Sequence, residues 1–165
     1  MSTTPWAFPH QPSLQAALGR LAIAHTQLEL ILRYCVKVLA ELDIHAALDA
    51  TDGERISDLR ERVRRLFKER RPTEVEKNNL DALLGRTKRF SEQRNTYLHS
   101  VFSATPEGEA IMKGADHRWG PAASESAIDE VTIEILRLAK EINDARLDGG
   151  FIQQVVARHN ASQSS

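Results

Sequence analysis

The chain of 165 residues has the length of a single domain, and 41% of its residues are hydrophobic, enough to build a buried core. No stretch approaches the roughly 20 apolar residues of a membrane span, and the N-terminus lacks the basic start and apolar region of a secretory signal. With Cys35 as the single cysteine, an intrachain disulfide is excluded. We therefore expect a soluble cytoplasmic protein with no membrane partner.

Charge is distributed unevenly, although the formal net charge is only -1. Residues 55–94 hold thirteen basic and seven acidic side chains, whereas the segments on either side are acidic. A basic segment of this kind can attract a polyanion such as RNA. A solvated helix face explains the same pattern, so charge alone does not decide between the two.

The spacing of hydrophobic residues predicts an all-α fold, an antiparallel bundle of four to five helices. Residues 1–12 contain three prolines and are expected to form an irregular arm. Residues 13–157 would form one helical-bundle domain, and residues 158–165 a disordered tail.

Three helices are predicted in the first part of the chain. The first covers about residues 13–42, and the second lies between a break at Gly53 and the stop at Pro72. A capping box then starts a third helix, over about residues 73–102. The first helix also has a second apolar patch, roughly opposite its main stripe, which indicates either a central helix or a site of self-association. The patch consists of Ile23, Leu30, Tyr34 and Val38.

The remaining chain begins with a segment rich in Gly and Pro. Residues 103–123 are expected to be irregular, with a short hairpin around Pro106-Glu107-Gly108. A fourth helix runs from Ser126 to about Ala145. The pair Gly149-Gly150 then marks a break before a last short helix.

Common catalytic and cofactor motifs are missing from the sequence. It has no H-E-x-x-H, no Cys/His pair at zinc spacing, no phosphate-binding Gly-rich loop and no G-x-S-x-G elbow, so we expect neither a metal nor a cofactor. Cys35 falls in the apolar stripe of the first helix and is interpreted as a core residue, not a nucleophile.

One polar constellation remains, near the end of the third helix. At about 100° per residue, Arg94 falls within the apolar arc of that helix, where a cation needs compensation. Asn95 and His99 are four residues apart and share one edge of the arc, and Ser91 continues that edge one turn earlier. Arg94 and His99 would flank one groove and could reach one phosphate from two sides.

The pattern formed by Arg94, Asn95 and His99 resembles the motif of the HEPN superfamily of small helical-bundle proteins. That motif is an Arg, usually followed by a polar residue, and then a His after four to six intervening positions. The fold-level resemblance covers about residues 13–145. It implies a metal-independent endoribonuclease of toxin–antitoxin or abortive-infection type, a homodimer with both motifs at one cleft, and an antitoxin or nucleotidyltransferase as partner. The position of the tyrosine that such a nucleotidyltransferase modifies, two after the His, is Val101 here.

The residue types fit this chemistry. His99 suits general acid–base work near neutral pH when a 2′-OH attacks the adjacent phosphate. Arg94 would stabilise the charge on that phosphate, and Asn95 would orient the imidazole. We expect Glu29, on the first helix, to lie within hydrogen-bond reach of Arg94 or His99 and to compensate the cation.

The basic second helix would bind flanking RNA phosphates. The residues concerned are Arg60, Arg62, Arg64 and Arg65. Two alternatives stay open at this point. One is a non-catalytic HEPN-like module for dimerisation or partner binding, and the other is a nucleic-acid-binding helical protein without catalysis.

Overall fold

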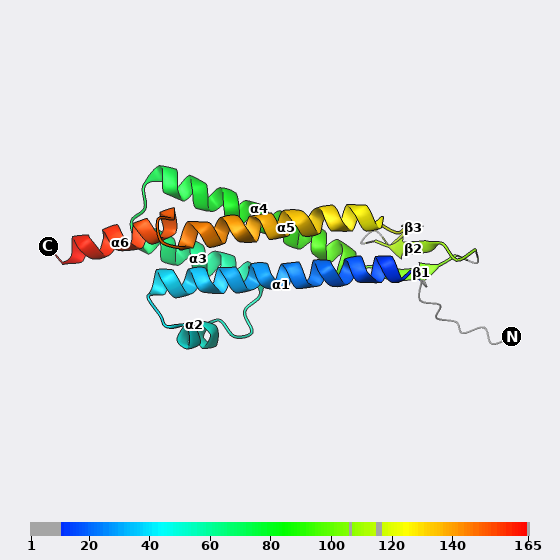
Figure 1. Ribbon diagram of the computed structural model, residues 1–165, viewed down its shortest axis with the longest axis horizontal. Coiled ribbons are helices and arrows are strands. Elements are labelled where there is room, and N and C mark those ends of the chain that lie inside the picture. Colours follow the sequence, from blue (N-terminus) through cyan, green and yellow to red (C-terminus); the bar gives the residue numbers. More distant parts are fainter. Residues whose placement is uncertain (1–10, 106, 115–116, 165) are drawn as a thin grey trace.

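The computed structural model describes residues 11–105, 107–114 and 117–164 and is mostly helical (Figure 1). An elongated bundle of helices carries a small sheet at one end. The helices are α1 (Pro12–Ala40), α2 (Ile44–Ala50), α3 (Ile56–Glu69), α4 (Glu74–Leu98), α5 (Glu125–Arg146) and α6 (Phe151–Gln163). The strands are β1 (Val101–Ala104), β2 (Ala110–Lys113) and β3 (Trp119–Pro121). Of the predicted arm, residues 1–10 lie outside the described residues, and Pro12 begins α1.

α1 is the central helix of the core. Its predicted apolar stripe is buried from Leu14 to Leu39, against α3, α4, α5 and α6. Cys35 is fully buried in that stripe, and burial raises the pKa of its thiol to about 12, which confirms a core role. Within the described ranges, no helix combines the length and apolar character needed to cross a membrane.

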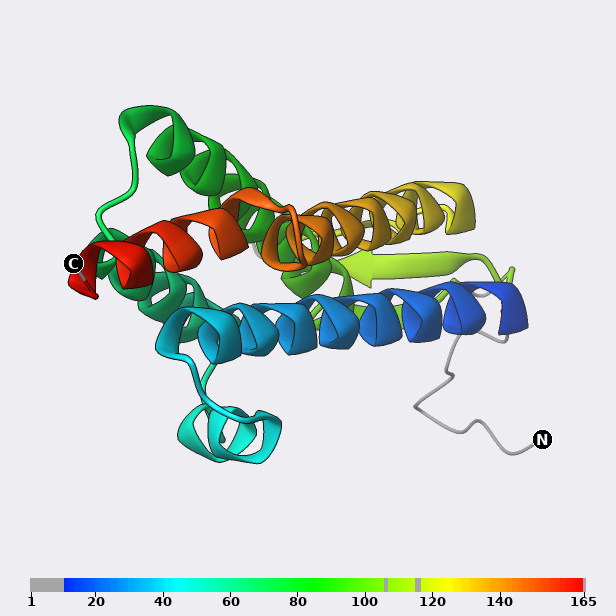
Figure 2. The same ribbon diagram turned by 60° about the vertical axis from the view of Figure 1, so that its left-hand side comes forward.

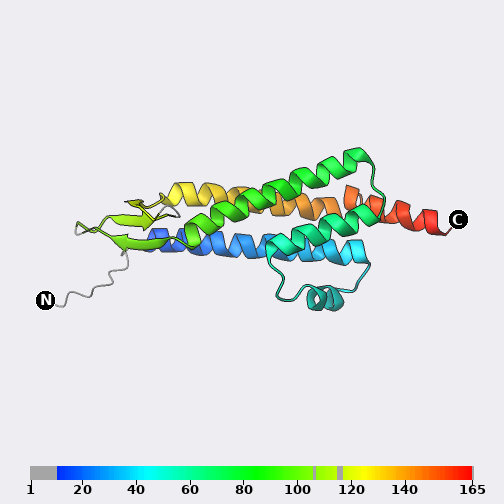
Figure 3. The ribbon, with the colours of Figure 1, turned by 180° about the vertical axis from the view of Figure 1, so that it is seen from behind.

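The helices are not simply antiparallel. Arg20, near the start of α1, donates from Nε to Asp129 Oδ1 (3.0 Å) near the start of α5, so these two helices run in the same direction. Their distal ends meet as well, because the Arg146 guanidinium lies 4.8 Å from the centre of the Tyr34 ring. α3 also runs with α1, and α4 runs against them (Figures 1 and 3).

The connections explain this arrangement. The segment that carries α2 brings the chain back beside α1, so α3 starts partway along the bundle, and α2 projects from the side (Figure 2). α4 then returns to the end where α1 begins, and the sheet turns the chain there before α5. The prediction of an antiparallel bundle is therefore wrong for α1, α3 and α5, which run in the same direction.

The segment after α4 forms more regular structure than expected. The predicted hairpin is confirmed by its strands, since β1 pairs with β2 in antiparallel register and the Gly108 N–H donates to the Thr105 carbonyl (2.9 Å); Pro106 lies outside the described residues. β3 adds a third strand that the sequence analysis missed. α4 correspondingly ends at Leu98 instead of near residue 102.

The predicted disordered tail, residues 158–165, is instead helical up to Gln163. Long-range contacts hold it in place. Arg158 Nη2 lies 2.8 Å from Glu76 Oε2 at the start of α4, and Arg70 donates to Asn160 Oδ1 (3.2 Å). These partners are distant in sequence, so no local pattern revealed them.

Two glycines, Gly85 in α4 and Gly150 before α6, predict opposite effects of alanine. A Cβ on Gly150, which precedes α6, would lie 2.3 Å from the carbonyl oxygens of Asp144 and Ala145. Gly150→Ala should therefore lower the free energy of unfolding by about 1–3 kcal/mol. Gly85, exposed in the middle of α4, has open space around it, so Gly85→Ala should raise the free energy of unfolding by about 0.5–1 kcal/mol. Urea unfolding measures both changes, and equal effects would contradict the close approach at Gly150.

Candidate functional site

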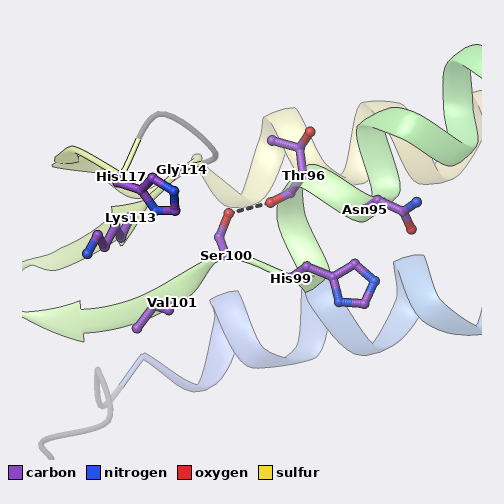
Figure 4. Close-up of a pocket in the computed structure, with 8 residues that line it drawn as sticks. All are labelled: Asn95, Thr96, His99, Ser100, Val101, Lys113, Gly114 and His117. Atoms are coloured by element: carbon purple, nitrogen blue, oxygen red, sulfur yellow. Dashed lines mark hydrogen bonds between the residues drawn. The ribbon is translucent and has the colours of Figure 1, made fainter.

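The predicted motif lies where α4 meets the sheet. Asn95 is in the last turn of α4, and His99 caps its C-terminus with its backbone N–H bonded to the Asn95 carbonyl (3.0 Å). Because the two residues are one helical turn apart, their side chains share a face. Both line an open cavity of about 280 Å³ (Figure 4).

The sheet supplies the other wall of this cavity. The α4 end provides Asn95, Thr96, His99 and Ser100, and the sheet provides Val101, Lys113, Gly114 and His117. Among these described lining residues none carries a carboxylate, so the site favours an anion. The sequence analysis missed Lys113 and His117. The predicted hairpin could have indicated Lys113, because the strand register sets it directly opposite Val101, two residues after His99.

Arg94 lies beside this cavity and does not line it. Its Nη1 donates to the Asn95 side-chain oxygen (3.0 Å), which ties the guanidinium to a lining residue. Its Nε is buried and has no hydrogen-bond partner among the residues that the structure describes. The arginine is thus held from one side through Nη1, while its buried Nε is an unsatisfied donor in the described part of the chain.

Glu29 does not meet the motif as expected. Its Oε1 lies 3.3 Å from Nδ1 of His25, and neither Arg94 nor His99 is within ion-pair distance of it in the described part of the chain. The pKa of Glu29 is lowered, mainly by its hydrogen bond with His25, with smaller contributions from the charges of Arg94 and Arg33. The prediction of a direct contact is therefore wrong, because the nearer imidazole takes the carboxylate.

Ser91 belongs to the same inner network. Its Oγ is hydrogen-bonded to Nε2 of His25 (3.2 Å) and donates to the Thr87 carbonyl (2.8 Å). His25 is only 4% exposed, and Ser91 is buried as well, so both lie between α1 and α4 and away from the cavity. We assign Ser91 and Glu29 to the packing of α4 on α1 in the neighbourhood of the motif.

The four arginines of α3 all contact groups of this chain. Arg60 Nε donates to the Leu84 carbonyl (3.0 Å), and Arg64 Nε to Asp81 (2.9 Å). Arg62 pairs with Glu54, and Arg65 with Glu69 (3.2 Å).

Leu84, the partner of Arg60, precedes His99 by fifteen residues along the α4 helix axis, or about 22 Å. The arginine side chains of α3 are thus outside the cavity, and their contact with flanking RNA stays a prediction.

No metal site emerges in the described ranges, where no group of three or more His, Cys, Asp or Glu side chains is arranged to hold an ion.

The inner network predicts a pH-dependent effect of Glu29→Gln. Since the pKa of Glu29 is below its ordinary 4.5 in the folded protein, its contribution to stability is complete above about pH 4.5 and is lost as the pH falls through the folded-state pKa. Glu29→Gln should cost about 1 kcal/mol at neutral pH, and the difference from wild type should shrink in acid. Urea unfolding from about pH 7 to about pH 3 measures it.

Glu134→Gln is the matched control, because Glu134 is partly exposed on α5 and pairs locally with Arg137. It should change the free energy of unfolding by less than about 0.5 kcal/mol. A loss at Glu29 that stays constant over the whole pH range would contradict the carboxylate–imidazole interaction.

No protein-family model, curated protein or solved structure matches this chain. The candidate site is therefore interpreted from its own residues and geometry.

Proposed function

We propose that the protein is a metal-independent endoribonuclease of the HEPN type, with a toxin or defence role. The observation that carries this proposal is the cavity at the end of α4, where His99 and Asn95 lie on one wall and no described lining residue is acidic. A phosphodiester is an anion, and a neutral or cationic wall with an exposed imidazole suits its binding and its cleavage.

The reaction assigns one role to each residue of the motif. His99 exchanges a proton with the reacting RNA, while the 2′-oxygen attacks phosphorus and the bond to the 5′-oxygen breaks. Arg94, beside the cavity, stabilises the added negative charge by its own positive charge, and its contact with Asn95 ties it to the cavity wall. The products are a 2′,3′-cyclic phosphate and a 5′-hydroxyl, and the reaction needs no other reactant.

The partners follow from the same proposal. Single-stranded or looped RNA is the substrate, and the exposed parts of Arg64 and Arg65 on α3 would contact its flanking phosphates. A toxin needs a neutralising partner, either an antitoxin or a nucleotidyltransferase. Val101 replaces the tyrosine that a nucleotidyltransferase modifies, so the antitoxin is the better supported of the two.

The second candidate function is a non-catalytic HEPN-like module for dimerisation or partner binding. Exposed apolar side chains on the two parallel helices favour it: Ile23 and Leu30 on α1, and Ile133 and Leu136 on α5. Ile23 is 62% exposed although it lies in the middle of a helix. Such residues are common at association surfaces. This candidate predicts association without cleavage.

Replacement of His99 tests the enzymatic function. Purified wild type should cleave a defined RNA in excess EDTA and leave DNA of the same sequence intact, because DNA lacks the attacking 2′-OH. His99→Ala should abolish cleavage, and Asn95→Ala should weaken it. Arg94→Ala should also lose activity, and its thermal unfolding must be measured first, since the side chain is half-buried.

Three results would contradict the ribonuclease. They are cleavage that EDTA abolishes, cleavage that persists in His99→Ala, and steeply salt-dependent RNA binding that leaves the RNA intact. The last result would instead favour a plain nucleic-acid-binding protein. His45→Ala is the control, because His45 is exposed on α2, far from the cavity.

A homodimer is the expected assembly. A two-fold interface would bring the two Arg94–His99 motifs together, with α4 at the interface and the exposed face of α1 as the alternative. Ile23→Glu should shift the equilibrium toward monomer if α1 forms the interface and leave it unchanged if α4 does. Sedimentation equilibrium at tens of micromolar measures this, and a wild-type monomer would count against the dimer.

A further inference from the structure

The cavity contains a second imidazole, contributed by the sheet. His117 lies between β2 and β3, and its backbone N–H donates to the Gly114 carbonyl (3.0 Å), which closes the turn at the cavity wall. In Figure 4 the His99 ring lies next to the Asn95 side chain, and the His117 ring lies near Lys113, on the other side of Ser100. The two imidazoles thus border the cavity from different elements.

Both imidazoles are available for chemistry. They are exposed, and neither ring has a hydrogen bond or ion pair with another residue in the ranges described. Lys113 likewise has no ion pair with any described residue, so its ammonium can bind an external anion. Apart from these three, the described lining residues are uncharged, and the wall therefore combines two titratable rings with one fixed cation.

The backbone at His117 adds an independent observation. Its φ is +60°, a left-handed conformation in which glycine would be the least strained residue. Histidine tolerates this conformation better than most residues but still at some cost. A histidine kept at such a position in the wall of a cavity is typical of a functional site.

We propose that His117 is the second proton-transfer group of the site, acting with His99 of the same chain on a phosphodiester that Lys113 holds between them. The inference rests on the proposed ribonuclease function and deepens it. One imidazole takes the proton of the 2′-OH as the O2′–P bond forms. The other gives a proton to the 5′-oxygen as the P–O5′ bond breaks. The site therefore takes up one proton and gives up one proton in each reaction. Proton exchange with water then returns both imidazoles to their starting protonation states for the next turnover.

The placement suits this division of labour. The attacking and leaving oxygens lie on opposite sides of phosphorus, so a base and an acid are needed on two sides of one bound phosphate. A single imidazole would have to serve both sides in succession. With His99 at the end of α4 and His117 in the turn between β2 and β3, one chain supplies both groups, and a partner subunit is not needed to complete the site.

His117→Asn is the variant that tests the proposal, because Asn also tolerates a positive φ and has no proton to transfer at neutral pH. It should lower kcat for RNA about 100-fold or more, and the bell-shaped pH profile of kcat/KM should lose one limb. Lys113→Met should mainly raise KM. His45→Asn, at an exposed position on α2, is the matched control and should behave as wild type.

An activated substrate separates the two roles. A nucleoside 3′-(4-nitrophenyl phosphate) releases nitrophenolate without needing a proton. One of the two variants, His99→Ala or His117→Asn, should therefore recover most of its activity on this substrate. Equal losses on both substrates by both variants would mean that neither imidazole protonates the leaving 5′-oxygen, and would overturn the proposal.

Mixing the two variants tests whether the site lies within one chain. His99→Ala and His117→Asn should stay inactive together, since each chain lacks one group. Restored cleavage would place His99 and His117 of one site on different subunits and would overturn the proposal. Wild-type activity in His117→Asn with loss in His99→Ala would overturn it too, while leaving the ribonuclease intact. Absence of cleavage by wild type would instead refute the proposed function itself.

Discussion

The buried imidazole of His25 fixes how the last turns of α4 lie against α1. It contacts Glu29 through Nδ1 (3.3 Å) and Ser91 through Nε2 (3.2 Å), so both nitrogens have partners although the ring is buried. A buried polar group without partners would be costly, and the register of α4 on α1 is therefore restricted to the one that satisfies it. Since Asn95 and His99 follow Ser91 on the same helix, their position depends on this contact.

Much of the fold follows from local patterns. The apolar stripe of α1 and the hairpin turn were both predicted correctly, because each depends on residues close together in sequence. α2 was missed, since a helix of seven residues has too little periodicity to detect. Its end is held by Arg33 Nη1, which donates to Thr51 Oγ1 (3.0 Å) across eighteen positions. The helical end of α6 likewise depends on Glu76, which binds Arg158.

The candidate site was predictable only in part, for a similar reason. The four-residue spacing of Asn95 and His99 sets them on one helix face whatever the tertiary structure, and both do line the cavity. Lys113 reaches the cavity through strand register, which requires the exact pairing with Val101. The partner of Glu29 was misjudged because helix spacing gives a face of the helix but does not rank two neighbouring groups, the imidazole of His25 and the guanidinium of Arg94, as partners.

Arg94 connects the inner network with the cavity. On one side its charge helps to lower the pKa of Glu29, and on the other it donates to the side-chain oxygen of Asn95. The NH₂ group of Asn95 has no hydrogen-bond partner among the described residues, so it can donate. Asn95 lines the cavity, so a donor is available there for a phosphate oxygen or for the imidazole of His99. The arginine therefore acts on the site in two ways, by its charge and by fixing the orientation of the Asn95 amide. A change to Lys would keep the charge, but Lys lacks the planar guanidinium that fixes the amide.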